Sequence, residues 1–168
     1  MLLDTAPMGL NIVLIEPEIP QNTGNIARTC AAIGASLHLV EPLGFSIDDR
    51  HLRRAGLDYW SLLDVHRYRS QREFFDRVSE RLCIFASTKG HVSHAEMRYA
   101  DRAYIVFGNE TTGLADSLLR RHGERTVRIP MRNGARSLNL SNAVAIVAFE
   151  ALRQLAYPGL VVRPNTMP

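Results

Sequence analysis

Short apolar runs alternate with amphipathic stretches along most of the chain. The apolar runs are continuous and rich in β-branched residues, as expected of parallel strands that are buried on both faces. They predict strands at 10–15, 37–40, 82–86, 103–107 and 126–129. The amphipathic stretches predict helices at 24–33, 71–80, 114–120 and 141–157. This alternation predicts an α/β fold, a parallel sheet sandwiched by helices.

The first and last predicted helices carry further signals. Asn22 or Thr23 is expected to cap the start of the first helix, and Gly34 is expected to end it. The last helix is apolar nearly all round between positions 144 and 149. Such a helix is expected to be buried, either in the core or between subunits.

Composition places the chain among globular proteins of a reducing compartment. Its 168 residues fit one domain, and 46% apolar with 22% charged residues are ordinary globular values. Cys30 and Cys83 form neither a disulfide framework nor a zinc site. The N-terminus carries Asp4 and no basic region, and the longest apolar stretch, 143–149, is too short to cross a bilayer. We therefore expect a cytoplasmic protein without a membrane partner.

The basic residues are almost all arginine. The net charge is +3, and Lys89 is the only lysine among 20 basic residues. The planar fork of arginine matches phosphate oxygens, which suits a nucleic-acid partner, although a genome-wide bias towards arginine codons is the favoured explanation of the ratio. The basic residues gather at Arg50, His51, Arg53 and Arg54, at His66, Arg67, Arg69 and Arg72, and at Arg128, Arg132 and Arg136. Acidic residues interrupt these groups, so the pattern permits RNA binding without requiring it.

Three segments of unusual composition join predicted strands to predicted helices. In α/β sheets, ligands bind beyond the carboxyl ends of the strands, where these segments lie. The first, 16–29, presents Asn25 and Arg28 on one helix face, which suits an anionic or hydroxyl-bearing ligand. A capped helix with a solvated arginine accounts for the same residues.

The second and third segments add polar groups at the same edge of the sheet. In the second, 107–114, Gly108 follows a strand directly and is expected to leave room for a ligand beside Glu110. A tight turn with a carboxylate at a helix start is the alternative. The third segment, 128–145, crowds the start of the last helix with Ser137, Asn139, Ser141 and Asn142. One residue is enough to cap a helix, so the excess suggests binding groups.

The sequence lacks the motifs of several common nucleotide-binding, hydrolase and metal sites. The sequence has no G-x-G-x-x-G after the first strand, no G-K-[ST] and no G-x-S-x-G. His91 and His94 lie three residues apart, but no further ligands are arranged around them in the sequence. A solvated pair is therefore favoured over a metal site.

Taken together, the three segments resemble the three motifs of the SPOUT superfamily of RNA methyltransferases. The matching residues are Asn22-x-Gly24-Asn25-x-x-Arg28, then Phe107-Gly108-x-Glu110-x-x-Gly113, then Ile129-Pro130-Met131 with Ser137-x-Asn139-x-Ser141-Asn142. Within that superfamily, the spans 15–29, 41–60, 87–90 and 149–159 are similar to the transfer RNA wobble-nucleotide ribose 2′-O-methyltransferases. The resemblance runs from about residue 10 to residue 159.

The resemblance implies a fold and an assembly that the hydrophobic pattern does not give. It implies a single methyltransferase domain at 10–159 with a deep C-terminal trefoil knot, an N-terminal extension at 1–9, expected to be disordered, and a tail at 160–168. It also implies a homodimer whose sites draw on both subunits. The cofactor would be S-adenosylmethionine, converted to S-adenosylhomocysteine, with no metal. The knot loops would be 86–88, 108–113 and 129–138. The cofactor-binding residues would be Ala86, Gly108, Ile129, Ser137 and Leu138.

The resemblance also assigns the chemistry. It implies 2′-O-methylation of the ribose of wobble nucleotide 34 of transfer RNA, with leucine isoacceptors as the expected substrates. The catalytic residues would be Arg28, Asn22, Glu110, Ser137 and Asn139. Candidate RNA contacts are Arg53, Arg54, Lys89 and Arg132. The alternative for Arg53 and Arg54 is that they are only solvated residues of a helix. Two alternative functions are methylation of another transfer or ribosomal RNA position, and a non-catalytic module that binds RNA or cofactor.

Two positions depart from the pattern of that family. Asn109 stands where proline is usual between the glycine and the glutamate of the second motif, and is expected to loosen that loop. Phe149 replaces a common tyrosine in the last helix, and the lost hydroxyl is expected to change a dimer or RNA contact. Neither residue belongs to the catalytic set.

Overall fold

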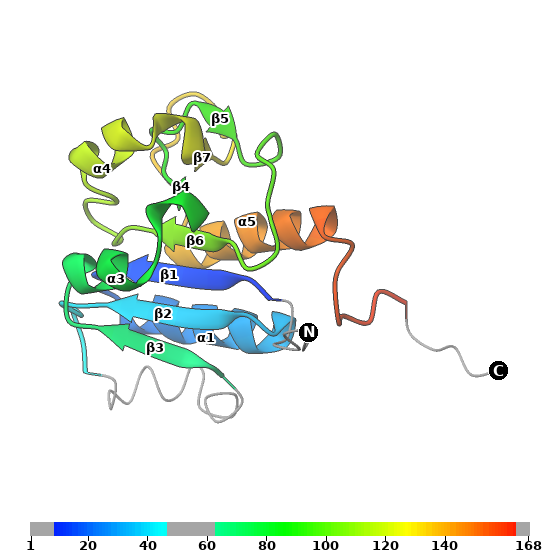
Figure 1. The fold of residues 1–168 in the computed structure, drawn as a ribbon. Coiled ribbons are helices and arrows are strands. Elements are labelled where there is room, and N and C mark those ends of the chain that lie inside the picture. Colours follow the sequence, from blue (N-terminus) through cyan, green and yellow to red (C-terminus); the bar gives the residue numbers. More distant parts are fainter. Residues whose placement is uncertain (1–8, 47–62, 164–168) are drawn as a thin grey trace.

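The computed structural model describes residues 9–46 and 63–163, and within them the chain forms a seven-stranded parallel sheet (Figure 1). The strands lie in the order β3-β2-β1-β6-β4-β7-β5, and every pair of neighbours is parallel. They are β1 (Asn11–Ile15), β2 (Ser36–Val40), β3 (Val65–Tyr68), β4 (Cys83–Ala86), β5 (Val92–Ser93), β6 (Tyr104–Phe107) and β7 (Thr126–Arg128). The predicted α/β class and parallel sheet are confirmed.

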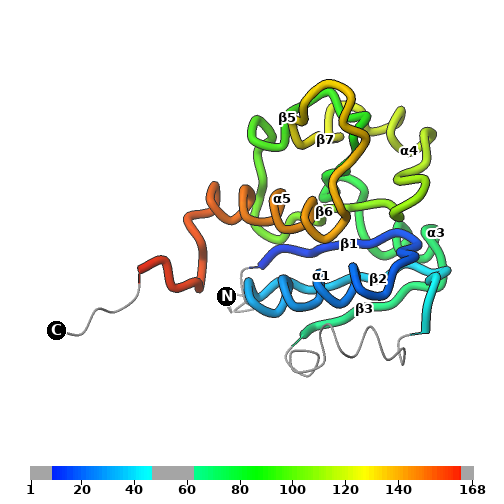
Figure 2. Tube along the Cα trace, turned by 180° about the vertical axis from the view of Figure 1, so that it is seen from behind, coloured from blue at the N-terminus to red at the C-terminus, as the bar shows by residue number. Residues whose placement is uncertain are grey.

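Helices cover both faces of this sheet. They are α1 (Pro20–Ile33), α3 (Gln71–Arg77), α4 (Asp116–Arg121) and α5 (Leu140–Gln154), with short 3-10 turns at Glu80–Leu82 and Gly123–Arg125. Helices α1 and α5 lie side by side on one face, as the view from behind shows (Figure 2). The side chains of β1 alternate between the faces: Ile12 and Leu14 join the core under α1 and α5, whereas Val13 and Ile15 join the core under α3 and α4.

All five predicted strands are present, each within one residue of its predicted ends. Two further strands were missed. Strand β3 lies at the edge of the sheet and exposes His66 and Arg67, so its sequence lacks an apolar run. Strand β5, at the other edge, is only two residues long.

The predicted cap of α1 is wrong. The helix begins at Pro20, and its N-cap residue is Ile19, which makes no side-chain capping bond. Asn22 and Thr23 are buried within the first turns instead. Proline lacks an N–H and has a helical φ, so it starts a helix readily. Gly34 ends the helix in the left-handed conformation, at φ 68, as predicted.

Helix α5 has one buried and one exposed apolar face. Val144, Val147 and Ala148 are fully buried in the core. Ile146 and Phe149 lie on the other side of the helix and are 38% and 47% exposed. The core therefore accounts for only part of the apolar character that the sequence predicted. None of the described helices is both long and apolar enough to span a membrane.

His38 of β2 is a polar side chain that is buried within the sheet. Asn11 donates its Nδ2 hydrogen to the Arg102 carbonyl, so its Oδ1 is left to accept from His38 Nε2 at 3.0 Å. His38 Nδ1 then accepts from the Tyr68 hydroxyl at 3.0 Å. This arrangement requires a neutral imidazole. The pKa of His38 is lowered from 6.5 to about 4, chiefly by burial and also by the nearby His66, while Asp64 opposes the shift.

The His38 network is expected to make stability depend on pH. Between pH 7 and pH 5 the unfolded chain takes up a proton at His38 that the folded chain does not, so stability falls as the pH falls. The contribution of His38 to the free energy of unfolding should decrease by about 2 kcal/mol over this range. Urea unfolding of the wild type and of His38→Gln at both pH values tests this. Equal losses in the two proteins would contradict it.

Candidate functional site

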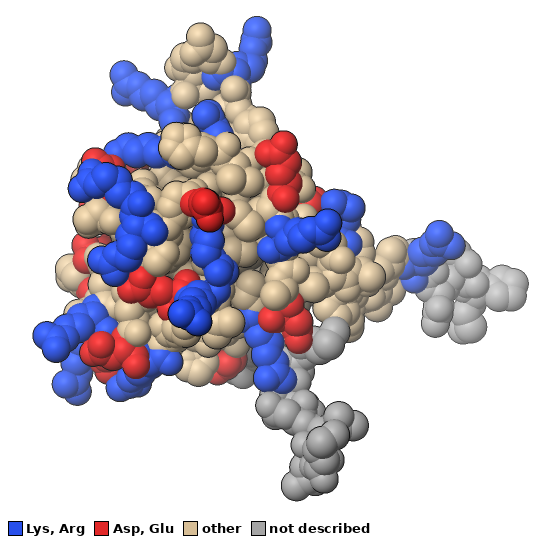
Figure 3. Space-filling view, turned by 45° about the horizontal axis from the view of Figure 1, so that its top comes forward, with Lys and Arg blue, Asp and Glu red and all other residues tan. Residues whose placement is uncertain are grey.

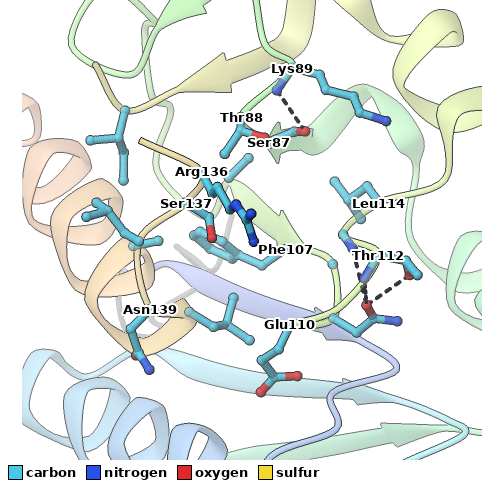
Figure 4. A pocket seen from close by; sticks show the side chains of 18 of the residues that line it. Ser87, Thr88, Lys89, Phe107, Glu110, Thr112, Leu114, Arg136, Ser137 and Asn139 are labelled. Atoms are coloured by element: carbon cyan, nitrogen blue, oxygen red, sulfur yellow. Dashed lines mark hydrogen bonds between the residues drawn. The ribbon is translucent and has the colours of Figure 1, made fainter. Parts of the chain in front are cut away.

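A cavity of about 650 Å³ lies at the carboxyl edge of the sheet (Figure 4). Its walls come from the segments that follow β4, β6 and β7, and from the start of α5. Its volume falls in the range typical of small-molecule sites. All five residues predicted to bind cofactor line it: Ala86, Gly108, Ile129, Ser137 and Leu138. The catalytic candidates Asn22, Glu110 and Asn139 also line it, as does Ser137. The three sequence motifs therefore meet at one cavity.

The role expected of Gly108 needs correction. A Cβ atom at Gly108 would lie 2.1 Å from the carbonyl carbon of Gly113 and 2.3 Å from the amide nitrogen of Leu114. The missing side chain thus allows the loop after β6 to fold back on its own backbone. Room for a ligand does not explain this glycine, although Gly108 does line the cavity.

The loosening expected from Asn109 is also wrong. Its Oδ1 accepts hydrogen bonds from the Thr112 amide at 2.7 Å, the Thr112 hydroxyl at 3.0 Å and the Gly113 amide at 3.2 Å. The Gly113 amide also donates to the Asn109 carbonyl at 3.2 Å. The asparagine side chain therefore closes the loop with bonds that a proline could not make.

Glu110 joins the second motif to the first. Its carboxylate accepts the backbone N–H groups of Glu18 at 2.8 Å and Ile19 at 3.2 Å, just before α1, and the Nδ2 hydrogen of Asn22 at 3.0 Å. A carboxylate beside the first N–H groups of a helix is favoured by the helix dipole. Glu110 therefore takes the capping role that the sequence assigned to Asn22 or Thr23.

Asn22 and Asn139 extend this connection to the third motif. Because Asn22 donates to Glu110, its Oδ1 is free to accept from Asn139 Nδ2 at 2.9 Å. The Oδ1 of Asn139 in turn accepts from the amide of Ser141 at 2.9 Å and from its hydroxyl at 2.7 Å, which caps α5. The chemistry of Glu110, which only accepts, sets the direction of every bond in this chain. Three segments far apart in the sequence are thereby held in one arrangement.

The hydrogen bond between Asn22 and Glu110 can be tested by exchanging the carboxylate and the amide between the two positions. Asn22→Asp would place a carboxylate against that of Glu110 and is expected to lower the free energy of unfolding by about 2 kcal/mol. Adding Glu110→Gln restores a donor opposite Asp and should recover at least part of that loss. Chemical unfolding of the two single variants and the double variant at pH 8 measures the coupling. A double variant whose loss equals the sum of the single losses would disprove it.

Arg28 is not among the residues that line the cavity. It is an exposed residue of α1, almost two turns beyond Asn22. Of the RNA candidates, Lys89 lies at the cavity, with its Nζ 2.6 Å from Asp116 Oδ1. Arg132 is exposed outside the cavity lining, and Arg53 and Arg54 lie outside the described residues.

Several further residues of the cavity were given no site role from the sequence. The walls also include Thr88, Phe107, Met131, Arg136, Leu140 and Val147. Arg136 immediately precedes Ser137, and this adjacency to the third motif was the available signal. In the described part of the chain, no group of three His, Cys, Asp or Glu residues is placed to hold a metal ion.

A parallel α/β fold with a cavity built from three strand-end loops is typical of proteins that bind a small molecule at the carboxyl edge of the sheet. Residues 9–149 match the SpoU rRNA Methylase family, and the chain belongs to this family. It is 50% identical to the tRNA (cytidine(34)-2′-O)-methyltransferase of Escherichia coli K12, over 92% of this chain and 99% of that protein.

Two solved structures are similar to the whole domain. One, from work on the 2-OH methylation of C/U34 on tRNA, has a TM-score of 0.83 and 44% identity, and the match covers 90% of this chain and 99% of that chain. The other is an AdoMet-bound rRNA methyltransferase from Sinorhizobium meliloti, with a TM-score of 0.78 and 26% identity. That match covers 91% of this chain and 59% of the other.

Proposed function

We propose that this protein is a transfer RNA methyltransferase that moves a methyl group from S-adenosylmethionine to the ribose 2′-oxygen of wobble nucleotide 34. The observation that carries the proposal is the cavity, where three motifs separated in sequence meet. The relative from Escherichia coli, which bears that activity in its name, matches over nearly its whole length. We expect leucine transfer RNAs to be the substrates and the cytoplasm to be the compartment.

The residues of the cavity fit the cofactor. Apolar side chains of Ile129, Leu138, Leu140 and Val147 offer a wall for adenine, and the adjoining backbone of the loops offers hydrogen-bonding groups. When bound, S-adenosylmethionine supplies a methyl group that its sulfonium activates for displacement. Glu110, Asn22 and Asn139 serve this site by holding its walls together, because their polar atoms are engaged with one another and with backbone.

A trefoil knot in the C-terminal half is part of the proposal. Support comes from the strand order, in which β4 lies between β6 and β7, and from the contact between the segment after β4 and strand β7. A Cβ atom at Gly90 would lie 2.6 Å from the carbonyl carbon of Val127, so the two backbones touch there. Membership of a family with this fold supports threading of the segment 129–138 beneath the loop after β4.

A homodimer completes the catalytic site in this proposal. The support is twofold: Ile146 and Phe149 leave an apolar face of α5 exposed, and Arg28 lies on the adjacent helix α1, outside the cavity of its own chain. Pairing two copies through the α1 and α5 face would cover the apolar side chains. It would also bring Arg28 of one protomer to the cavity of its partner.

In that position Arg28 acts on the nucleophile. A ribose 2′-hydroxyl is a weak nucleophile, so it must be oriented and its proton must be removed during attack. A guanidinium donates hydrogen bonds and keeps its charge in nearly every protein environment. Arg28 therefore orients the 2′-oxygen and stabilises the negative charge that develops on it, while the hydroxyl proton passes to solvent water.

RNA binds to basic side chains on the protein surface in this proposal. Lys and Arg side chains are spread over the face shown in Figure 3, with acidic side chains between them. Lys89 and Arg132 lie at or near the cavity mouth in this proposal, and Arg53 and Arg54 complete the candidate set. Each phosphate contact should contribute roughly 0.7 to 0.9 to the slope of log affinity against log salt concentration.

Methyl transfer from labelled cofactor to purified transfer RNA tests the proposal. We expect label in leucine transfer RNAs, and mass spectrometry of nuclease fragments should place a 2′-O-methylated nucleoside at position 34. A methyl group at another position, or in ribosomal RNA only, would replace this substrate with the alternative. Cofactor binding without transfer to any RNA would favour a non-catalytic module.

A further inference from the structure

Arg136 lines the cavity but belongs to neither the catalytic nor the RNA-binding candidates. The basic side chains that line the cavity are Lys89 and Arg136. Lys89 is paired with Asp116, at 2.6 Å. Arg136 makes no ion pair with the carboxylates of the described residues. Figure 4 shows its side chain extending from the loop before α5 towards the middle of the cavity.

The carboxylate of the cavity does not explain this arginine. Glu110 already accepts three N–H groups, from Glu18, Ile19 and Asn22, at 2.8 to 3.2 Å. A guanidinium that faces a cavity without a carboxylate partner suits an oxyanion of a ligand, because its planar fork donates two parallel hydrogen bonds.

The backbone that carries Arg136 is fixed on both sides. Before it, the Ala135 amide closes a turn by donating to the Arg132 carbonyl at 3.1 Å. After it, Asn139 caps α5 and donates to Asn22 at 2.9 Å. The guanidinium is therefore presented to the cavity from an anchored segment, as a group that positions a ligand must be.

We propose that Arg136 binds the phosphate on the 3′ side of the nucleotide whose ribose is methylated. This inference rests on the proposed function. The 2′-oxygen and the 3′-phosphate are carried by adjacent carbon atoms of the ribose. A ribose held for transfer at the cavity therefore brings that phosphate to the same place.

Two features favour the phosphate over the carboxylate of the cofactor. Arg136 is an exposed residue, so it can meet an RNA that arrives from solvent. The cofactor also carries two positive groups of its own, its sulfonium and its ammonium, which repel a guanidinium. A bound guanidinium further offsets the charge of the phosphate while negative charge develops on the neighbouring 2′-oxygen. Arg136 should thus affect turnover as well as RNA affinity.

A chemical double-mutant cycle tests the contact. Transfer RNA is assembled with a single uncharged methylphosphonate linkage on the 3′ side of nucleotide 34, and kcat/KM is measured for the wild type and Arg136→Gln on both RNAs. For the wild type, the uncharged linkage is expected to reduce kcat/KM by about tenfold or more, and Arg136→Gln should cause a similar loss on normal RNA. The two changes together should cost little more than either alone.

Arg132→Gln is the matched control, because Arg132 lies on the same loop but outside the cavity lining. Its effect should multiply with that of the methylphosphonate. If the losses in kcat/KM caused by Arg136→Gln and by the methylphosphonate also multiply, the proposal is overturned. So would a tenfold loss of S-adenosylhomocysteine affinity in Arg136→Gln without RNA, which would assign the oxyanion to the cofactor. If the wild type methylates no normal transfer RNA, the proposed function fails and this inference fails with it.

Discussion

Arg28→Lys is expected to reduce methyl transfer by about 100-fold or more while leaving the affinity for S-adenosylmethionine unchanged. Arg28 lies outside the cavity, so the cofactor does not depend on it. Lysine keeps the charge but loses the planar fork that orients a hydroxyl or phosphate through two bonds. Single-turnover methylation measures the first quantity and calorimetry the second. Transfer at the wild-type rate would remove Arg28 from the mechanism.

Mixed dimers test whether Arg28 acts on the partner's site. One chain carries Arg28→Lys, and the other carries Leu138→Glu, which places a charge in the apolar wall of the cavity. If Arg28 acts across the interface, the mixed dimer contains one site with an intact cavity and an intact arginine. Its activity should then be about half that of the wild type, although each parent dimer is inactive. An inactive mixed dimer would show that Arg28 acts within its own chain.

Gly108→Ala is expected to lower the free energy of unfolding by about 3 kcal/mol and to abolish cofactor binding. The added Cβ would lie 2.1 Å from backbone of the same loop, so the loop must move, and that loop forms a wall of the cavity. Thermal unfolding with and without S-adenosylhomocysteine measures both effects. The wild type should be stabilised by the ligand and the variant should not.

Gly123→Ala is the matched control for that substitution. A Cβ atom at Gly123 would have no heavy atom within 4 Å, and its φ is not in the left-handed region. Its stability and ligand response should therefore stay near those of the wild type. If Gly108→Ala behaves in the same way, the close approach of the loop to itself is not required.

The hydrophobic pattern was sufficient to predict the strands that form the middle of the sheet. Beyond their first residues, runs such as Asn11–Ile15 and Tyr104–Phe107 are buried on both faces, so their inner positions are all apolar. The edge strand Val65–Tyr68 could not be found in this way, because only part of it is buried. The start of α1 was missed because its N–H groups are satisfied by Glu110, which lies 88 residues beyond Asn22.

In the site, too, the sequence predicted local features but not contacts between distant segments. The sequence motifs identified residues that line the cavity, because each motif follows a strand and the ends of parallel strands meet. The motifs did not reveal that Glu110, Asn22 and Asn139 bond to one another, since that depends on the packing of three distant segments. They also did not separate Arg28, outside the cavity, from Arg136, within its wall.

Calorimetric titration of the purified protein with S-adenosylmethionine tests whether these three loops form a cofactor site. We expect saturable binding with a dissociation constant in the micromolar range for the wild type and for Gly123→Ala, and no binding for Gly108→Ala. Absence of heat from the folded wild-type protein with both S-adenosylmethionine and S-adenosylhomocysteine, in the presence of transfer RNA, would contradict it.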